Sequence, residues 1–103
     1  MRFLILAFFV LLTGVAGSAR QIMIFNYGDE PIFWVSVGHV QTAQWSEDVL
    51  PSNDVIDVGE GKTVSVPVGS DCIYDLRAKY HDGDTVELSG IDLCTATSVR
   101  FEH

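Results

Sequence analysis

Two cysteines, Cys72 and Cys94, enclose the part of the sequence that constrains the fold most. Between them, apolar and polar residues alternate in two runs that meet at Asp82-Gly83-Asp84. Alternation with a period of two is typical of β-strands, and a short Asp-Gly segment between two such runs indicates a hairpin turn. The sequence therefore predicts antiparallel strands over residues 72–80 and 85–92, with the cysteines at their open ends.

The register of this hairpin is predicted from the disulfide, the apolar face and the charges together. If residues pair when their numbers add up to 166, Cys72 lies opposite Cys94 and Lys79 lies opposite Glu87. The same register places Ala78 opposite Leu88, so that apolar residues share one face. A shift of one residue would place the apolar sets of the two strands on opposite faces. Directly opposed residues lie close enough for a disulfide, so we predict a Cys72–Cys94 bridge.

This register has two consequences for the second strand. It requires a turn of three or five residues, or a β-bulge near Gly83 or Gly90. It also places Asp92 on the same face as Tyr74. Either Gly90 shifts Asp92, or its carboxylate is partly buried and holds backbone N–H groups or the Tyr74 hydroxyl; a strand-end carboxylate that faces water is the alternative.

The N-terminal segment is typical of a secretory signal peptide. A short basic start precedes an unbroken apolar run over residues 3–12, and small residues follow up to Ala19. Gly17 and Ala19 predict cleavage before Arg20. A transmembrane anchor is the alternative, but a bilayer core takes about twenty apolar residues and glycines interrupt this run. We therefore predict a signal peptide over residues 1–19 and an exported protein, periplasmic or extracellular, where a disulfide persists.

Residues 20–103 are predicted to form one domain, a small antiparallel β-sandwich of six to seven strands with one disulfide. Short β-rich runs are separated by Gly, Asp, Asn and Pro at intervals of about eight to twelve residues. Strands are expected at residues 21–26, 32–37, 62–68, 72–80, 85–92 and 95–101, with a weaker one at 54–58. A single helical turn within residues 43–50 would face Trp45 inward.

The charge balance excludes two classes of partner. The formal net charge is −8, and Arg2 is the one charged residue within the predicted signal peptide. Binding to nucleic acid or to an anionic membrane depends on basic side chains. We therefore expect no nucleic-acid partner, and no membrane binding after signal cleavage.

No spacing typical of a catalytic or metal site occurs. Zinc ligands usually come in closely spaced pairs, whereas the three histidines are far apart in sequence: His39, His81 and His103. Five carboxylates precede the strand expected at residues 62–68, namely Glu47, Asp48, Asp54, Asp57 and Glu60. They lack the spacing of a calcium loop, so a solvated acidic loop is favoured over a weak calcium site. We predict no catalytic residue, no cofactor and no metal, and hence no enzyme.

Two tryptophans are the candidate anchors for a protein partner. Alternation over residues 32–37 predicts Phe33 and Val35 on one face and Ile32 and Trp34 on the other. Trp34 either packs in the core or at its rim, or is exposed as an interface anchor. The leading hypothesis is a non-enzymatic protein-binding module. The alternatives are a structural or accessory subunit of an envelope complex, which an unpaired edge strand would favour, and a small hydrolase or metal-dependent enzyme, which a pocket joining His39 or His81 to two carboxylates would favour.

The chain also resembles a family of small exported bacterial β-proteins. The resemblance rests on an Asn before the first turn (Asn26), a Trp-x-x-Asp segment (Trp45 to Asp48), and a hairpin that runs from Cys-x-Tyr-Asp-x-Arg through Asp-Gly to Asp-x-Cys. It implies export and a compact β fold, and it implies no active site. The sequence does not identify the binding residues; the candidates are Trp34, Trp45, Asp75, Arg77 and Asp92.

Overall fold

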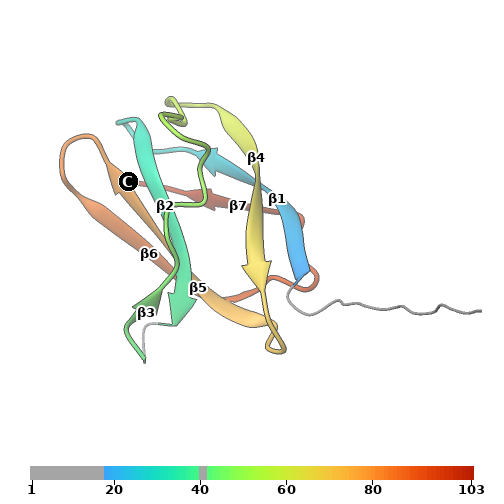
Figure 1. Cartoon of the computed structure of the whole chain (residues 1–103). Helices are drawn as coiled ribbons and strands as arrows, with labels where there is room; N and C mark the ends of the chain where they lie inside the picture. Colours follow the sequence, from blue (N-terminus) through green and yellow to red (C-terminus); the bar gives the residue numbers. More distant parts are fainter. Residues whose placement is uncertain (1–17, 40–41) are drawn as a thin grey trace, which may run out of the picture.

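Seven strands in two facing sheets make up the part of the chain that the structure describes (Figure 1). The computed structural model describes residues 18–39 and 42–103, and no helix occurs within these ranges. The strands are β1 (Ser18–Asn26), β2 (Ile32–His39), β3 (Gln44–Trp45), β4 (Gly61–Val68), β5 (Ile73–Tyr80), β6 (Thr85–Asp92) and β7 (Ser98–Phe101). The predicted all-β sandwich is confirmed. The described part of the chain has no helix that could cross a bilayer.

The chain passes back and forth between the sheets. One sheet has the strand order β4-β1-β7, and the other has β3-β2-β5-β6. Neighbouring strands are antiparallel except β1 and β7, which run parallel. Alternation cannot distinguish parallel from antiparallel pairing, because both place successive side chains on opposite faces. The long connection that a parallel pair needs is supplied here by all the strands between β1 and β7.

Most of the predicted signal peptide, residues 1–17, lies outside the described residues. Its last two residues, Ser18 and Ala19, belong to β1, where they pair with Val68 and Pro67 of β4. Cleavage before Arg20 stays a prediction, and it would remove these two pairs from the β1–β4 ladder.

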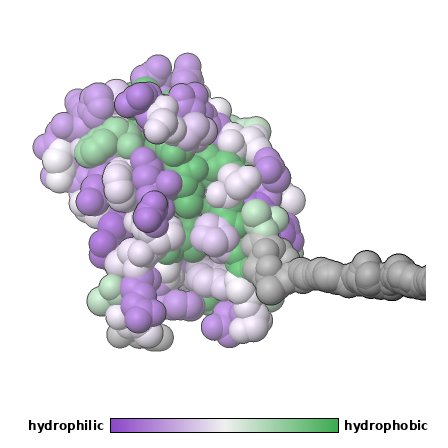
Figure 2. Space-filling view, viewed as in Figure 1, coloured by the Kyte–Doolittle hydropathy of each residue, from purple (hydrophilic) through white to green (hydrophobic). Residues whose placement is uncertain are grey.

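Inward-facing residues of both sheets form one apolar core. Strand β4 shows the pattern most clearly, because every second residue from Val64 is buried. Figure 2 shows apolar residues in the middle of this view, between the positions that β2 and β4 occupy in Figure 1. The buried apolar residues are Ile22, Ile24, Ile32, Val35, Val37, Leu50, Ile56, Val64, Val66, Val68, Leu76, Ala78, Tyr80, Leu93 and Phe101.

In the β5–β6 hairpin, Leu76 and Ala78 face the core as predicted, but the pairing of the two strands is shifted by two residues from the prediction. Arg77, not Lys79, lies opposite Glu87. The backbone N–H of Tyr80 donates to the Asp84 carbonyl at 2.9 Å, which leaves a three-residue turn over residues 81–83. Its last residue is a glycine with a φ of 94°. A left-handed glycine at that position is typical of three-residue hairpin turns, so one of the predicted turn lengths is confirmed.

A β-bulge on β6 carries the hairpin from one register to another. Leu76 pairs with Leu88 but Tyr74 pairs with Ile91, so two residues of β6 oppose one of β5. One of the two is Gly90, with a φ of 70°. The predicted bulge near Gly90 is therefore confirmed. The bulge turns Asp92 to the face opposite Tyr74, which is one of the three outcomes that the sequence left open.

The disulfide closes the open end of the hairpin. Cys72 and Cys94 are bonded, with a Cα–Cα distance of 5.2 Å. The backbone N–H of Leu93 donates to the Cys72 carbonyl at 2.8 Å, so the chain remains paired up to the bridge. Residues 93–95 then form a turn, which shortens the predicted strand at 95–101 to β7.

The Trp-x-x-Asp segment covers the free edge of β2 instead of forming a helical turn. The backbone N–H of Val35 donates to Asp48 Oδ1, and that of Val37 donates to Ser46 Oγ, both at 2.9 Å. Side-chain oxygens thus replace carbonyls of a regular strand partner. The predicted strand at 54–58 is also wrong, because Ile56 makes only an isolated bridge to Ile32.

Candidate functional site

The outer face of the four-stranded sheet holds four of the five residues predicted to bind. Since Leu76 and Ala78 of β5 face the core, Asp75, Arg77 and Lys79 alternate to the outer side. Neighbouring strands add a tryptophan each, Trp34 on β2 and Trp45 on β3. We call these five residues, Trp34, Trp45, Asp75, Arg77 and Lys79, the tryptophan face.

Trp34 lies on this face because it alternates with the buried Val35, and a bulge in β2 separates it from Ile32. Ile32 pairs with Tyr80 but Trp34 pairs with Lys79, so Phe33 is an extra residue in the ladder. The predicted alternation is therefore wrong at the start of β2: Ile32 is fully buried, and Phe33 is 39% exposed, with its ring 5.4 Å from that of His81. Trp34 is neither in the core nor fully exposed: it faces outward beside Lys79 of β5 and is half-buried.

Trp45 is held by a cation and does not face inward as predicted. The Cζ atom of Arg77 lies 4.0 Å from the centroid of the Trp45 ring. The guanidinium is fixed in turn by Glu87, with Nη2 and Nε at 2.6 and 2.8 Å from the same carboxylate oxygen. Ser36, opposite Arg77, is 2% exposed although it points outward. The Trp45–Arg77–Glu87 group therefore forms a packed layer outside the sheet.

Trp34 has a similar but looser partner. The Lys79 ammonium lies 5.0 Å from the centroid of its ring. Within residues 18–39 and 42–103, Lys79 makes no ion pair, so its charge remains available to a ligand. The face thus presents two half-buried indoles and an accessible cation on a protein that is otherwise acidic.

The two predicted aspartates each accept a hydrogen bond from a backbone N–H group. Asp75 Oδ1 accepts from the backbone N–H of Gly90 at 3.0 Å, which stabilises the β6 bulge. Asp92, half-buried, accepts from the Cys94 N–H at 2.9 Å, in agreement with one of the roles considered from the sequence. The Tyr74 hydroxyl instead accepts from the Gly69 N–H at 2.8 Å. Asp92 lies beside the disulfide and is not part of the tryptophan face.

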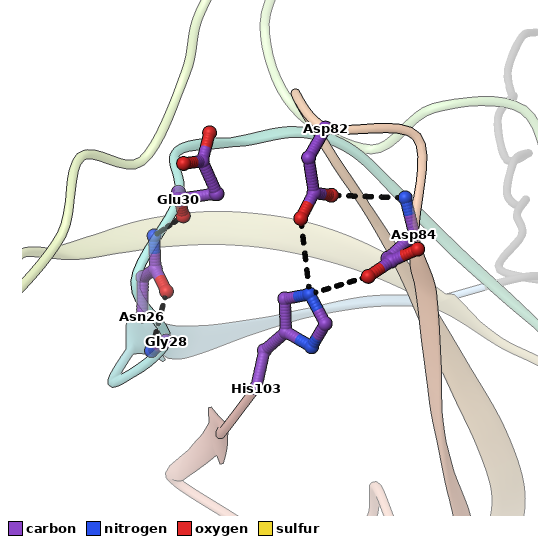
Figure 3. A network of polar contacts seen from close by, with 6 residues as sticks. All are labelled: Asn26, Gly28, Glu30, Asp82, Asp84 and His103. Atoms are coloured by element: carbon purple, nitrogen blue, oxygen red, sulfur yellow. Dashed lines mark hydrogen bonds and ion pairs between the residues drawn. The ribbon is translucent and has the colours of Figure 1, made fainter.

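A second polar cluster lies at the end of the sandwich where the β5–β6 turn meets the C-terminal segment (Figure 3). His103 Nε2 is 3.3 Å from Asp82 Oδ2 and 2.9 Å from Asp84 Oδ2. The hydrogen bond from the Asp84 backbone N–H, together with His103, lowers the pKa of Asp82. The hydrogen bond to Asp82 raises the pKa of His103, helped by the charges of Asp84 and Asp29. No local sequence signal indicates this cluster, because His103 is 21 residues away from Asp82.

Beneath His103 lies a buried tyrosine. The Tyr80 and His103 rings are 4.6 Å apart, and Tyr80 is fully buried. No described residue forms a hydrogen bond with the Tyr80 hydroxyl. Burial, followed by the negative charges of Asp29 and Asp82, raises the pKa of Tyr80, so the phenol stays protonated at neutral pH.

Two groups of residues in the described part of the chain have the spacing to hold a metal ion. One is Cys72, Asp92 and Cys94, and the other is Asp82, Asp84 and His103. The sulfurs of the first group are joined in the disulfide, so neither is a thiolate ligand. In the second group, His103 Nε2 already lies within ion-pair distance of both carboxylates, which makes the group a cluster of mutual polar contacts.

The other predicted polar residues do not converge. Of the loop carboxylates, Asp54 pairs with Lys62 at 3.2 Å, and none of the five belongs to either metal-compatible group in the described ranges. His39 lies against Tyr74, with the ring centroids 5.0 Å apart. The hydrolase or metalloenzyme alternative required His39 or His81 beside two carboxylates, and the histidine found in that position is His103.

The Asp82–His103 pair should make stability depend on pH. Because the pKa of His103 is raised by the bond to Asp82, its contribution is complete below the ordinary value of 6.5 and is lost as the pH rises through the folded value. The pKa of Asp82 is lowered by the Asp84 N–H and by His103, so its contribution is present above the ordinary value of 3.8 and is lost as the pH falls through the folded value. The pair should therefore contribute most between about pH 4 and 6.5.

Two variants test this dependence. NMR titration should show a lower imidazole pKa for His103 in Asp82→Asn than in the wild type, because the negative partner is lost. His103→Phe keeps a ring against Tyr80, and its melting temperature should differ most from that of the wild type within the same pH window. A difference that is constant from about pH 3 to pH 9 would contradict the ion pair.

No family model, no curated protein and no solved structure matches this chain. The resemblance to small exported bacterial proteins stays a prediction.

Proposed function

We propose that this protein is a non-enzymatic, exported binding module that holds a protein partner on its tryptophan face. One observation carries the proposal: two indoles lie on the outer side of a sheet, each in contact with a cation of β5. The apolar core does not require this arrangement, because this sheet contributes to the core through the residues on its inner side, such as Val35 and Leu76.

The chemistry of the face is typical of interface anchors. Tryptophan and arginine are enriched among residues whose truncation costs most binding energy. The Arg77–Glu87 pair holds Trp45 in place before a partner arrives, so less side-chain entropy is lost on binding. The disulfide accords with an oxidising compartment, which supports the proposed export.

A structural or accessory subunit of an envelope complex is the second candidate. Strands β4 and β6 lie at sheet edges and are eight residues long, so either has room for a partner strand. Both edges are interrupted, however: β4 contains Pro67, and β6 has the bulge that includes Gly90. Proline and bulges are devices that oppose edge-to-edge pairing, which favours the tryptophan face over the edges.

Comparative capture from an envelope extract tests the proposal. Four proteins would serve as baits: the wild type, Trp34→Ala, Trp45→Ala and the control Phe33→Ala. Melting curves would first establish that all four are equally stable. Phe33 is the matched control because it is an exposed aromatic residue of the same strand whose ring lies beside His81 and not beside a cation of β5.

A partner of the tryptophan face should be recovered by the wild type and by Phe33→Ala. Each tryptophan variant should lose about 2 kcal/mol of binding energy, a weakening of roughly thirtyfold in Kd. Equal recovery by all four baits would contradict binding on the tryptophan face and would favour binding at an edge strand. Equal loss in all three variants would also reject it, since Phe33 is not part of the face.

A further inference from the structure

A pocket of about 330 Å³ lies on the outer side of the other sheet. It is lined by Phe25 and Tyr27 at the end of β1 and by Ser98, Val99 and Arg100 of β7. We call it the β1–β7 pocket. Its size is at the lower end of the range for small-molecule sites, and fits one ring-sized group. None of its residues belongs to the tryptophan face, so a ligand of this pocket would be independent of the proposed function.

The aromatic wall of the pocket is held in place before any ligand binds. The Phe25 and Tyr27 rings are stacked, with centroids 5.9 Å apart and planes inclined by 6°. Phe25 lies over Gly61 of β4, where an added Cβ would come within 2.7 Å of the ring. The glycine therefore leaves space for the ring to lie against the sheet. Such a wall offers a flat apolar ligand a stacking surface with little entropy to lose.

Arg100 differs from the other two arginines that the structure describes. Both Nη atoms of Arg20 donate to backbone carbonyls, those of Cys94 and Ala96. The guanidinium of Arg77 is held by Glu87. Only Nε of Arg100 has a polar partner among the described residues, Glu102 at 3.5 Å, and both side chains of that pair are about two-thirds exposed. An ion pair so exposed contributes little, which leaves the two Nη groups of Arg100 available.

Arg100 lines the pocket together with the ring of Tyr27. Its Cζ atom lies 5.4 Å from the centroid of the Tyr27 ring. A guanidinium placed over a ring uses its face for that contact, while its N–H donors point along the plane. Two parallel N–H donors match a carboxylate, which they bind through two charge-assisted hydrogen bonds.

We infer that the β1–β7 pocket binds a small carboxylate with a flat apolar body. The carboxylate pairs with the Nη groups of Arg100, and the body packs against the rings of Phe25 and Tyr27. Two sources carry this chemistry: a free aromatic acid, and the C-terminal residue of a peptide that ends in an aromatic side chain. The net charge of −8 opposes the approach of any anion, and the pocket is open to solvent, so we expect Kd values on the order of millimolar.

NMR titration of the ¹⁵N-labelled protein with N-acetyl-phenylalanine tests the inference. Saturable shifts should appear at the amides of residues 25–27 and 98–101. The C-terminal amide of the same probe lacks the negative charge and should bind about tenfold more weakly. Phenylacetate and a tetrapeptide ending in phenylalanine separate the sources: the tighter binder of the two identifies which one the pocket prefers.

Two charge variants provide the control. Arg100→Gln should weaken binding of N-acetyl-phenylalanine about tenfold, whereas Lys62→Gln removes an equal charge outside the pocket and should change binding less than twofold. Amide spectra and melting curves establish that both variants fold. The inference is overturned if the shifts do not saturate, if the neutral amide binds as well as the acid, or if both variants weaken binding equally.

Discussion

Asn26→Ala should lower the free energy of unfolding by about 3–5 kcal/mol, the largest loss that we expect from any single polar side chain here. The Asn26 side chain is fully buried at the end of β1. Its amide nitrogen donates to the Glu30 carbonyl at 2.8 Å, and its oxygen accepts from the Gly28 N–H at 2.9 Å (Figure 3). The same nitrogen also donates to the Ile56 carbonyl at 2.9 Å. Alanine would leave all three backbone groups without this partner, and unmade buried hydrogen bonds are costly.

Urea unfolding followed by tryptophan fluorescence measures this loss. Asn26→Asp keeps the size and the acceptor but loses both donated bonds and buries a charge, so it should be at least as unstable as Asn26→Ala. Gln21→Ala is the matched control, because the Gln21 amide is exposed and bonds only to Ser65 Oγ within the described chain. It should change stability by less than about 0.5 kcal/mol. A loss below about 1 kcal/mol for Asn26→Ala would show that water replaces the amide.

Cys72→Ser should cost about 3 kcal/mol, the second large effect. The bridge closes a loop between residues 22 positions apart, and opening it increases the entropy of the unfolded chain. A domain of this size has a total stability of about 5–10 kcal/mol, so the variant should unfold at much lower urea concentration. The intact mass of the exported wild type should be two hydrogens below that of the reduced chain.

Reductant separates the bridge from the substitution. A reducing agent should destabilise the wild type by about as much as Cys72→Ser does, and should leave the melting curve of Cys72→Ser unchanged. Cys94→Ser and the double variant should match the single variant, because each removes the same bond. Free thiols in most of the non-reduced wild type would contradict the disulfide.

The candidate binding residues were predicted in part from the sequence. Trp34, Trp45, Asp75 and Arg77 were singled out separately, and the structure brings them to one face. For their neighbour Lys79, the sequence predicts an ion pair with Glu87 across the hairpin and no contact with a tryptophan. The two-residue difference in register explains this error, because it moves Glu87 from Lys79 to Arg77.

The sites at the other surfaces were not predicted. The Asp82–His103 cluster and the β1–β7 pocket both join segments that are distant in sequence. Spacing rules find ligands within a single turn or loop, and they cannot find residues that meet only because β7 pairs with β1.

Elements with a local signal could be identified from the amino-acid sequence alone. Alternation identified β4, β5 and β6, since each has one face toward the core, and the Asp-Gly turn between the cysteines defined the hairpin and its disulfide. Three features became apparent only in the folded chain: the parallel β1–β7 pair, the bulge at Phe33, and the loop that replaces a strand near Ile56. Strand order and bulges depend on how one sheet covers the other, and the energy of that packing comes from residues far apart in the chain.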